Sequence, residues 1–198
     1  MDRVDPPPAG FPPEIVTPRL VLRPVRRDDA PDIFAYASSP AVARWVAWEA
    51  HRDLGDTLGF IEQYALPSYA RGVPDPLAIT LAGSPRVVGT VGCHWVAEAH
   101  RAMELGYVLG EPWWGRGIAS EAAAAVMDYV FEHFPVERIQ ARCATEHAAS
   151  RRVMEKLGLC FEGVERSAML HAGRFWDLAC LSILRGEWRQ RKNPTPHF

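Results

Sequence analysis

The sequence predicts a mixed α/β fold with a largely antiparallel sheet of about seven strands and about four to five helices. Three observations predict this class. Seven short apolar runs between turn residues are typical of strands, and residues 118–133 repeat apolar side chains at helical spacing. The chain of 198 residues is 48% hydrophobic, which is enough for one core and too little for two comfortable domains.

The N-terminal segment is rich in proline. Residues 1–14 show no apolar periodicity, so we predict a flexible tail there. In residues 17–25, Leu20 and Leu22 alternate with Arg19, Val21 and Arg23. This alternation predicts a first strand with one buried face.

Acidic residues predict where the first helices begin. Asp28 or Asp29 can cap a first helix, and residues 41–46 form a second short one. Asp53 can cap a longer amphipathic helix, which we expect to end near Pro67.

Turn-forming residues divide the rest of the chain. The cluster at 83–85 joins two strands as a hairpin, Pro135 ends the long helix, and a second hairpin turns at 172–173. The predicted elements are strands 77–81, 87–95 and 103–109, helix 118–133, strand 138–144, helix 149–157, and strands 161–170 and 175–184. We therefore expect one domain over residues 15–190, followed by a C-terminal tail at 191–198.

The charge balance excludes partners that need a strong electrostatic field. The 22 basic residues nearly offset the 24 acidic ones, so we expect no nucleic acid and no membrane partner. The first residues do not resemble a secretion signal, and no apolar run approaches the roughly 20 residues of a membrane span. We expect a cytoplasmic protein that binds a small molecule or peptide. The sequence leaves open whether it forms a homodimer.

The four cysteines are far apart and show no CxxC spacing. We predict that they are free, buried thiols in a reducing compartment. They are Cys93, Cys143, Cys160 and Cys180.

A glycine-rich loop precedes the long helix. Gly115 and Gly117 have no Cβ, so backbone N–H groups can approach an anion closely. The positive end of the helix dipole at Ile118 adds to this, and Arg116 can add a direct charge. We interpret the loop as a pyrophosphate site formed by Trp114, Gly115, Arg116, Gly117, Ile118 and Ala119.

The loop also has three other possible interpretations. A tight turn before a helix would need no ligand at all. A dinucleotide-binding fingerprint needs a third glycine, where this chain has Ser120, and an acid at the end of the next strand. A P-loop needs GxxxxGK followed by Ser or Thr, which is absent.

In combination, the chain's motifs resemble the GNAT superfamily of N-acetyltransferases, and within it the RimJ/RimL type. The likeness spans about residues 15–188. The residues that carry it are 17–23 (TPRLVLR), 104–107 (ELGY), 114–122 (WGRGIASEA), 150–158 (SRRVMEKLG), 161–163 (FEG) and Asp177.

This resemblance implies a fold and an activity. The GNAT fold splays a parallel strand pair so that the pantetheine arm can lie between the two edges. The implied reaction moves an acetyl group from acetyl-CoA to a primary amine by direct attack in a ternary complex. The acceptor is expected to be a protein N-terminus or a small amine, and no metal is expected because the histidines lack ligand spacing.

Two residues are candidates for catalysis. Glu104 matches an acidic position of many relatives and is interpreted as the general base, or else as an ordinary surface carboxylate. Met154 stands where many GNAT enzymes have a tyrosine that protonates the CoA thiolate. Ser150 can bond the sulfur instead, or serve only as a first-turn helix residue.

Other candidates would contact the two substrates. The resemblance implies that the amide of Tyr107 or Val108 polarises the thioester carbonyl, and that His147 replaces an asparagine beside the CoA arm. Trp113 and Trp114 could wall the CoA or belong to the core. Candidate acceptor-site residues, with plain packing as the alternative, are Trp45, Trp48, Glu49 and His51.

Two other function classes stay open at this stage. A non-catalytic acyl-CoA-binding module would keep the loop and lack turnover, and the missing tyrosine favours it. A thiol hydrolase would use Cys93 or Cys143 beside a histidine, although cysteines in apolar strands are usually inert.

Overall fold

One eight-stranded sheet forms the centre of the computed structural model, which describes residues 11–193. The strand order is β1-β2-β3-β4-β5-β6-β8-β7, and every neighbouring pair is antiparallel except β5 and β6. The strands are β1 (Ile15–Val16), β2 (Leu20–Pro24), β3 (Leu77–Leu81), β4 (Val87–Ala97), β5 (Ala102–Leu109), β6 (Arg138–Ala144), β7 (Cys160–His171) and β8 (Arg174–Leu184). The predicted class is confirmed, with the short β1 as an additional strand.

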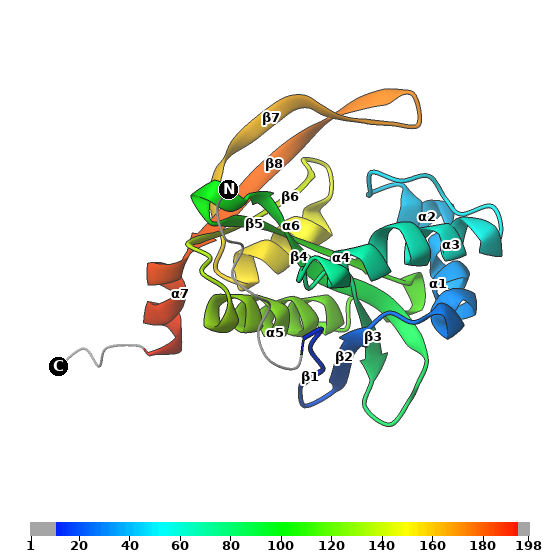
Figure 1. Cartoon of the computed structure of the whole chain (residues 1–198). Helices are drawn as coiled ribbons and strands as arrows, with labels where there is room; N and C mark the ends of the chain where they lie inside the picture. The colour runs from blue at the N-terminus through cyan, green and yellow to red at the C-terminus, as the bar shows by residue number, and fades with distance from the viewer. Residues whose placement is uncertain (1–10, 194–198) are drawn as a thin grey trace.

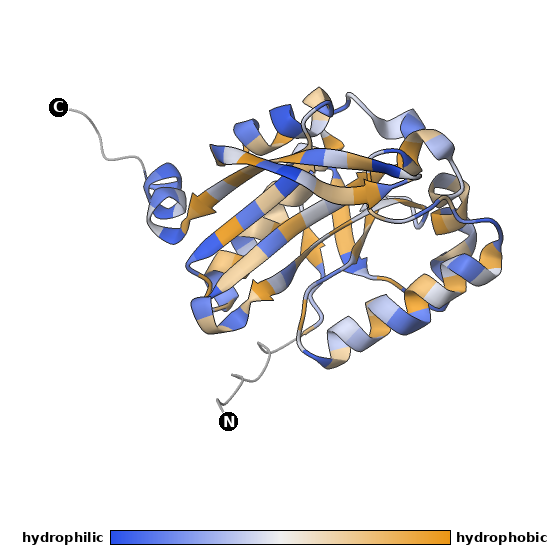
Figure 2. Ribbon diagram, turned by 90° about the horizontal axis from the view of Figure 1, so that it is seen from above, coloured by the Kyte–Doolittle hydropathy of each residue, from blue (hydrophilic) through white to orange (hydrophobic). Residues whose placement is uncertain are grey.

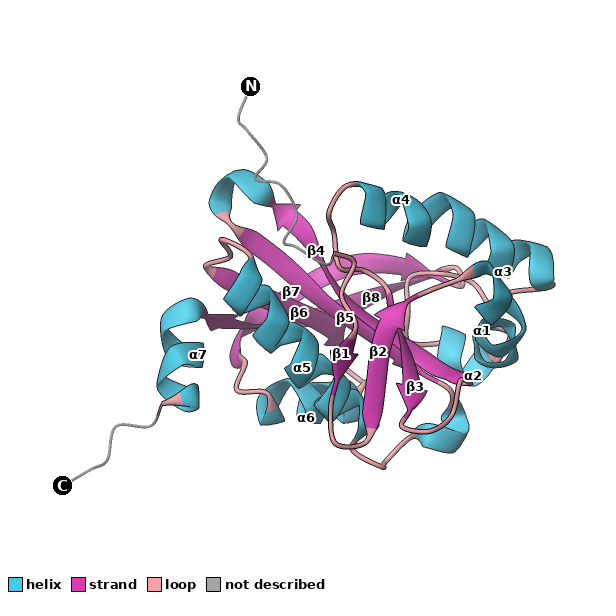
Figure 3. Cartoon of the chain, turned by 60° about the horizontal axis from the view of Figure 1, so that its bottom comes forward, coloured by secondary structure: helices cyan, strands magenta, loops and turns pink. Residues whose placement is uncertain are grey.

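Helices surround this sheet, and the β7–β8 hairpin extends past the other strands (Figure 1). The helices are α1 (Ala30–Ala37), α2 (Pro40–Ala43), α3 (Leu54–Phe60), α4 (Leu66–Ala70), α5 (Ile118–His133), α6 (Ala148–Lys156) and α7 (Arg185–Lys192). Figure 3 shows α5 and α6 together, well separated from α3 and α4. Within residues 11–193, no helix has both the length and the apolar content of a membrane span.

Strand alternation divides the core into two apolar layers. Leu77 and Ile79 of β3 belong to the larger cluster, which packs against α5, whereas Ala78 belongs to a second cluster with α1 and the segment that follows α3. This is the two-residue period expected of a sheet that is covered on both faces. In Figure 2 the strands carry many apolar residues, with polar residues between them.

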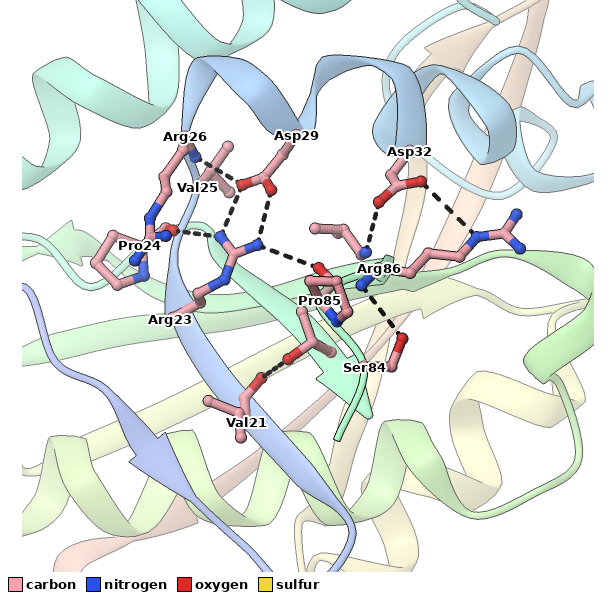
Figure 4. Close-up of polar contacts among 12 residues, drawn as sticks. Val21, Arg23, Pro24, Val25, Arg26, Asp29, Asp32, Ser84, Pro85 and Arg86 are labelled. Carbon is pink, nitrogen blue, oxygen red and sulfur yellow. Dashed lines mark hydrogen bonds and ion pairs between the residues drawn. The ribbon is translucent and has the colours of Figure 1, made fainter. Parts of the chain in front are cut away.

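Asp29 does not cap α1, contrary to the prediction. Its carboxylate accepts the Arg26 amide at 2.7 Å and two hydrogen bonds from the Arg23 guanidinium at 2.7 and 2.8 Å (Figure 4). Arg23 lies in β2, so this pair fastens the strand to the start of the helix. A bidentate arginine is a stronger partner for a carboxylate than the amides of a helix turn.

The helix that Asp53 begins continues beyond Pro67. The Asp53 carboxylate caps α3 by accepting the Asp56 amide at 3.1 Å, as predicted. A π-helical segment, Ile61–Ala65, then leads into α4, where Pro67 occupies the first turn. A proline is tolerated there because the first turn of a helix lacks partners for its N–H groups. The predicted end of this helix is therefore wrong.

Packing extends slightly beyond the predicted domain limits. Phe11 contacts Phe134 edge to face with ring centroids 6.4 Å apart, and α7 ends at Lys192. Residues 1–10 of the predicted tail, and 194–198 of the C-terminal one, lie outside the described residues. All four cysteines are free thiols, and Cys93 and Cys143 are buried as predicted. Cys160 is exposed and Cys180 is only partly buried, so the prediction of burial is wrong for these two.

Candidate functional site

The parallel strands β5 and β6 separate after three paired positions. Their pairing ends where Glu104 meets Gln140. Beyond it, β5 stays paired only with β4, and β6 only with β8. The facing edges, residues 105–109 and 141–144, therefore leave an opening into which an extended chain can fit as an additional strand.

The glycine-rich loop lies between β5 and α5. Gly115 and Gly117 have φ angles of +71° and +75°, which favour glycine, and Gly117 directly precedes Ile118 without a side-chain cap. The first N–H groups of α5 are therefore free to bind an anion.

The space over this loop is open. A Cβ added at Gly115 would meet no atom within 4 Å, and one at Gly117 would meet only Arg19 Nη2 at 3.4 Å. The Arg116 guanidinium lies 5.3 Å from the centre of the Trp113 ring. Trp114 is 44% exposed, and its indole N–H donates to the Leu109 carbonyl at 2.8 Å. The loop thus combines free amides, a cation and an aromatic wall, which fits the diphosphate and adenine of a nucleotide cofactor.

Contacts from the N-terminal strands hold the loop in place. Glu121, in the first turn of α5, accepts the Thr17 hydroxyl at 2.6 Å and the Arg19 guanidinium Nε at 2.6 Å. Arg19 Nη1 also donates to the Arg116 carbonyl at 3.0 Å. Partial burial acts to raise the pKa of Glu121, but the bonds from Thr17 and Arg19 outweigh it and lower that pKa. The sequence alone assigns no such role to Thr17, Arg19 or Glu121.

We predict that Glu121→Gln lowers the free energy of unfolding by about 2 kcal/mol at pH 7, because a hydrogen bond to a charged group contributes about that much. The pKa of Glu121 is lower in the folded state. Its contribution is thus complete above about pH 4.3, the unfolded value, and is lost as the pH falls through the folded value. Urea titrations at several pH values measure this. Glu132→Gln, at an exposed position of α5, is the control; equal losses in the two variants would contradict the prediction.

Glu104 occupies the last paired position of β5, where the two strands begin to separate. Its oxygens accept Gln140 Nε2 at 2.9 Å and Arg142 Nε at 3.0 and 3.2 Å. Arg142 also donates to Glu165 at 3.1 Å. The Glu104 side chain is 14% exposed. A carboxylate offers about four lone pairs, so Glu104 can accept a further hydrogen bond.

The face of the sheet opposite α5 is open beside Glu104. A Cβ at Gly106 would meet nothing within 4 Å, and Glu104 and Val108 point to the same face because side chains alternate along a strand. On β4, Gly92 pairs with Gly106, and Asp75 covers it, since a Cβ there would lie 2.2 Å from Asp75 Oδ1. An amine can therefore approach the strand opening from this face.

Tyr107 points to the other face, toward α6. Its hydroxyl lies 2.9 Å from Ser150 Oγ and 3.1 Å from the Ser150 carbonyl oxygen. Burial raises the pKa of Tyr107, so the phenol stays neutral near pH 7. Ser150 is 8% exposed, and Met154, one turn further along α6, is part of the core.

His147 belongs to an aromatic group at the end of β6. Its ring stacks on Trp45 with centroids 4.4 Å apart, and Trp45 meets Trp176 edge to face at 5.9 Å. Burial lowers the pKa of His147, so the imidazole is neutral near pH 7. Trp176, which the sequence analysis missed, has a buried indole N–H without a hydrogen-bond partner in this structure.

The candidate acceptor residues do not all meet in one place. Trp48, Glu49 and His51 line a cavity of about 950 Å³ together with residues of α3 and the π-helical segment. Trp45 is not part of its lining and stacks on His147 instead. Trp45 and Trp48 therefore lie in different places, although only two residues separate them in the sequence.

A second cavity of about 570 Å³ adjoins the first, since Tyr64 lines both. His94 and Trp95 of β4 form part of its wall. The Tyr64 hydroxyl donates to Asp75, which also lies 3.4 Å from His94 Nδ1, and this contact raises the pKa of His94. Among residues 11–193, no group of three or more His, Cys, Asp and Glu side chains is arranged to hold a metal ion.

Comparisons with known proteins agree with this geometry. A family model described as an acetyltransferase (GNAT) domain matches residues 19–159. The chain is similar to the uncharacterized N-acetyltransferase YoaA of Bacillus subtilis, with 33% identity over 87% of this chain and 97% of that protein. It is also similar to the putative ribosomal N-acetyltransferase YdaF of Bacillus subtilis, with 26% identity over 76% of this chain and 82% of that protein. The crystal structure of a GNAT-family acetyltransferase from Bacillus anthracis matches with a TM-score of 0.78 and 29% identity, over 88% of this chain and 99% of that one.

Proposed function

The chain belongs to the GNAT family of acetyltransferases, and from this premise we propose that it transfers the acetyl group of acetyl-CoA to the α-amino group at a protein N-terminus. The observation that carries the proposal is the opening between β5 and β6 beside a loop of free amides. Acetyl-CoA supplies a thioester carbonyl that is activated toward amines.

In this proposal the loop residues hold the cofactor. The diphosphate accepts hydrogen bonds from the amides of residues 115–119, and Arg116 adds its charge. The Trp114 amide already donates to the Glu111 carbonyl, so Trp114 contributes its ring. The amide of Tyr107 or Val108 polarises the thioester carbonyl. Ser150 donates to the sulfur, and neutral His147 borders the cofactor arm.

Glu104 acts on the acceptor amine, which approaches through the open space over Gly106. At pH 7, deprotonating an α-amino group with a pKa of about 7.8 costs about 1 kcal/mol, whereas a lysine with a pKa of about 10.4 costs about 4.6 kcal/mol. Glu104 already accepts hydrogen bonds from Arg142 and Gln140, so we assign it the less costly deprotonation, which is that of an α-amino group. This comparison favours an N-terminal acceptor over a lysine side chain.

Two further observations support a protein as acceptor. The two cavities share Tyr64 and are lined by aromatic side chains, among them Trp48, Phe60 and Trp95, which suit a peptide segment. The related protein YdaF is described as a putative ribosomal N-acetyltransferase. We assign the acceptor-binding role to Trp48 and Glu49 in the larger cavity, and to Trp45 where it stacks on His147.

The test is the rate of thiol release from acetyl-CoA with a panel of peptide N-termini, polyamines, amino acids and aminoglycosides. We expect sustained release with peptides, and acetylation at the α-nitrogen by mass spectrometry. Turnover with small amines alone would contradict the acceptor assignment. Binding of acetyl-CoA without turnover for any amine would make the chain an acyl-CoA-binding module.

A further inference from the structure

We propose that Tyr107 is a positioning residue that aims the Ser150 hydroxyl at the sulfur of the leaving thiol. The inference rests on the proposed function and extends it, because it explains how the site works with Met154 in place of the usual tyrosine. The phenol comes from β5 instead of α6, and it acts through the serine.

The geometry places this pair at the opening between the strands. Tyr107 lies in the part of β5 that is no longer paired with β6, and Ser150 lies in the first turn of α6, which follows β6. The hydrogen bond of 2.9 Å between the two hydroxyls therefore crosses from one side of the opening to the other. Both side chains are largely buried, so water competes little for this bond.

The phenol fixes the position of the serine oxygen. A serine in a helix commonly donates to a carbonyl of the preceding turn. Here Ser150 Oγ is bonded to Tyr107 instead. The phenol also donates to the Ser150 carbonyl at 3.1 Å, so two contacts hold this serine beside the opening. The hydrogen on Oγ can rotate about its C–O bond, so it can turn toward a sulfur atom that enters the opening.

The strand opposite Tyr107 carries a sulfur atom of the protein itself. Cys143 lies on the facing edge of β6. Burial raises the pKa of the Cys143 thiol, and the Ser150 hydroxyl acts in the opposite direction by hydrogen bonding. In general, a hydroxyl that donates to sulfur favours its charged form, and negative charge develops on the sulfur when the thioester breaks.

The reaction step balances without any further reactant. The amine nitrogen forms a bond to the acetyl carbon, the carbon–sulfur bond breaks, and the sulfur leaves with the bonding pair. The Ser150 hydrogen is shared with the sulfur but stays on the serine. The proton that the nitrogen loses finally reaches the thiolate through solvent.

A double-mutant cycle on kcat tests the proposal in the full-length enzyme, with acetyl-CoA and the best peptide of the panel. We expect Ser150→Ala to lower kcat about 100-fold and Tyr107→Phe about 10-fold, with the KM for acetyl-CoA nearly unchanged. Since Tyr107 acts through Ser150, Tyr107→Phe should cause no further loss in the Ser150→Ala background. Ser150→Thr, which keeps a hydroxyl, should retain more activity than Ser150→Ala.

Tyr129→Phe is the matched control, because Tyr129 lies on α5, where its ring stacks on His133; its kcat should equal that of the wild type. Equal losses from Tyr107→Phe in both backgrounds would mean that Tyr107 only holds β5 to α6, and would overturn the proposal. An unchanged kcat for Tyr107→Phe would also overturn it. If Tyr107→Phe does not fold, Tyr107→Met takes its place in the cycle. A wild-type protein that releases no thiol would refute the proposed function itself.

Discussion

Gly117→Trp should bind acetyl-CoA about 100-fold more weakly than the wild type. A Trp side chain at this position would enter the open space over the loop and block about two of its amides. Each hydrogen bond to a charged group contributes about 1.5–3 kcal/mol, and about 3 kcal/mol corresponds to the stated factor. Isothermal titration calorimetry measures the dissociation constant.

Gly83→Trp is the matched control for this substitution. Gly83 lies in the turn between β3 and β4 with a φ of +79°, and a Cβ there would meet nothing within 4 Å. Both variants therefore share the backbone strain of a left-handed Trp, about 1–2 kcal/mol. Only the Gly117 variant should lose affinity. If the two variants bind acetyl-CoA alike, the diphosphate does not lie on this loop.

Glu104→Gln should lower kcat/KM for a peptide acceptor about 100-fold at pH 7, which is typical for the loss of a general base. The loss should shrink to about 10-fold at pH 9. An α-amino group with a pKa of about 7.8 is mostly neutral there, so it needs less help from a base. Initial rates of thiol release across this pH range give the profile.

Glu104→Gln removes both the proposed base and the ion pair with Arg142, so the control must distinguish these two losses. Glu165→Gln removes the other carboxylate bonded to Arg142 and leaves Glu104 in place. We expect its kcat/KM to stay within about threefold of the wild type at both pH values, since an exposed pair contributes little. Equal losses at pH 7 and pH 9 for Glu104→Gln would exclude its role as a base.

Local patterns were sufficient to predict most elements of the fold. The helix 118–133 and the strands 77–81 and 138–144 have the predicted limits, because their apolar periodicity and flanking turn residues agree. The exceptions depend on distant or unusual partners. Asp29 bonds to a strand arginine, and the π-helical turn allows a helix to pass Pro67.

The residues of the site also fall into those that local sequence predicts and those that depend on distant partners. Gly115 and Gly117 stand next to a helix start, so the sequence predicts their shape directly. In contrast, Glu121 bonds to Thr17 across 104 residues, and Tyr107 reaches Ser150 across 43. A single sequence carries no local signal for such contacts, because they arise only when the sheet brings separate segments together.

A crystal structure of the protein with bound CoA tests the central claim most directly. We predict that the diphosphate oxygens lie within hydrogen-bond distance of the amides of residues 115–119, with the pantetheine arm between residues 105–109 of β5 and 141–144 of β6. A cofactor bound elsewhere, or a loop closed over by its own side chains, would contradict the account.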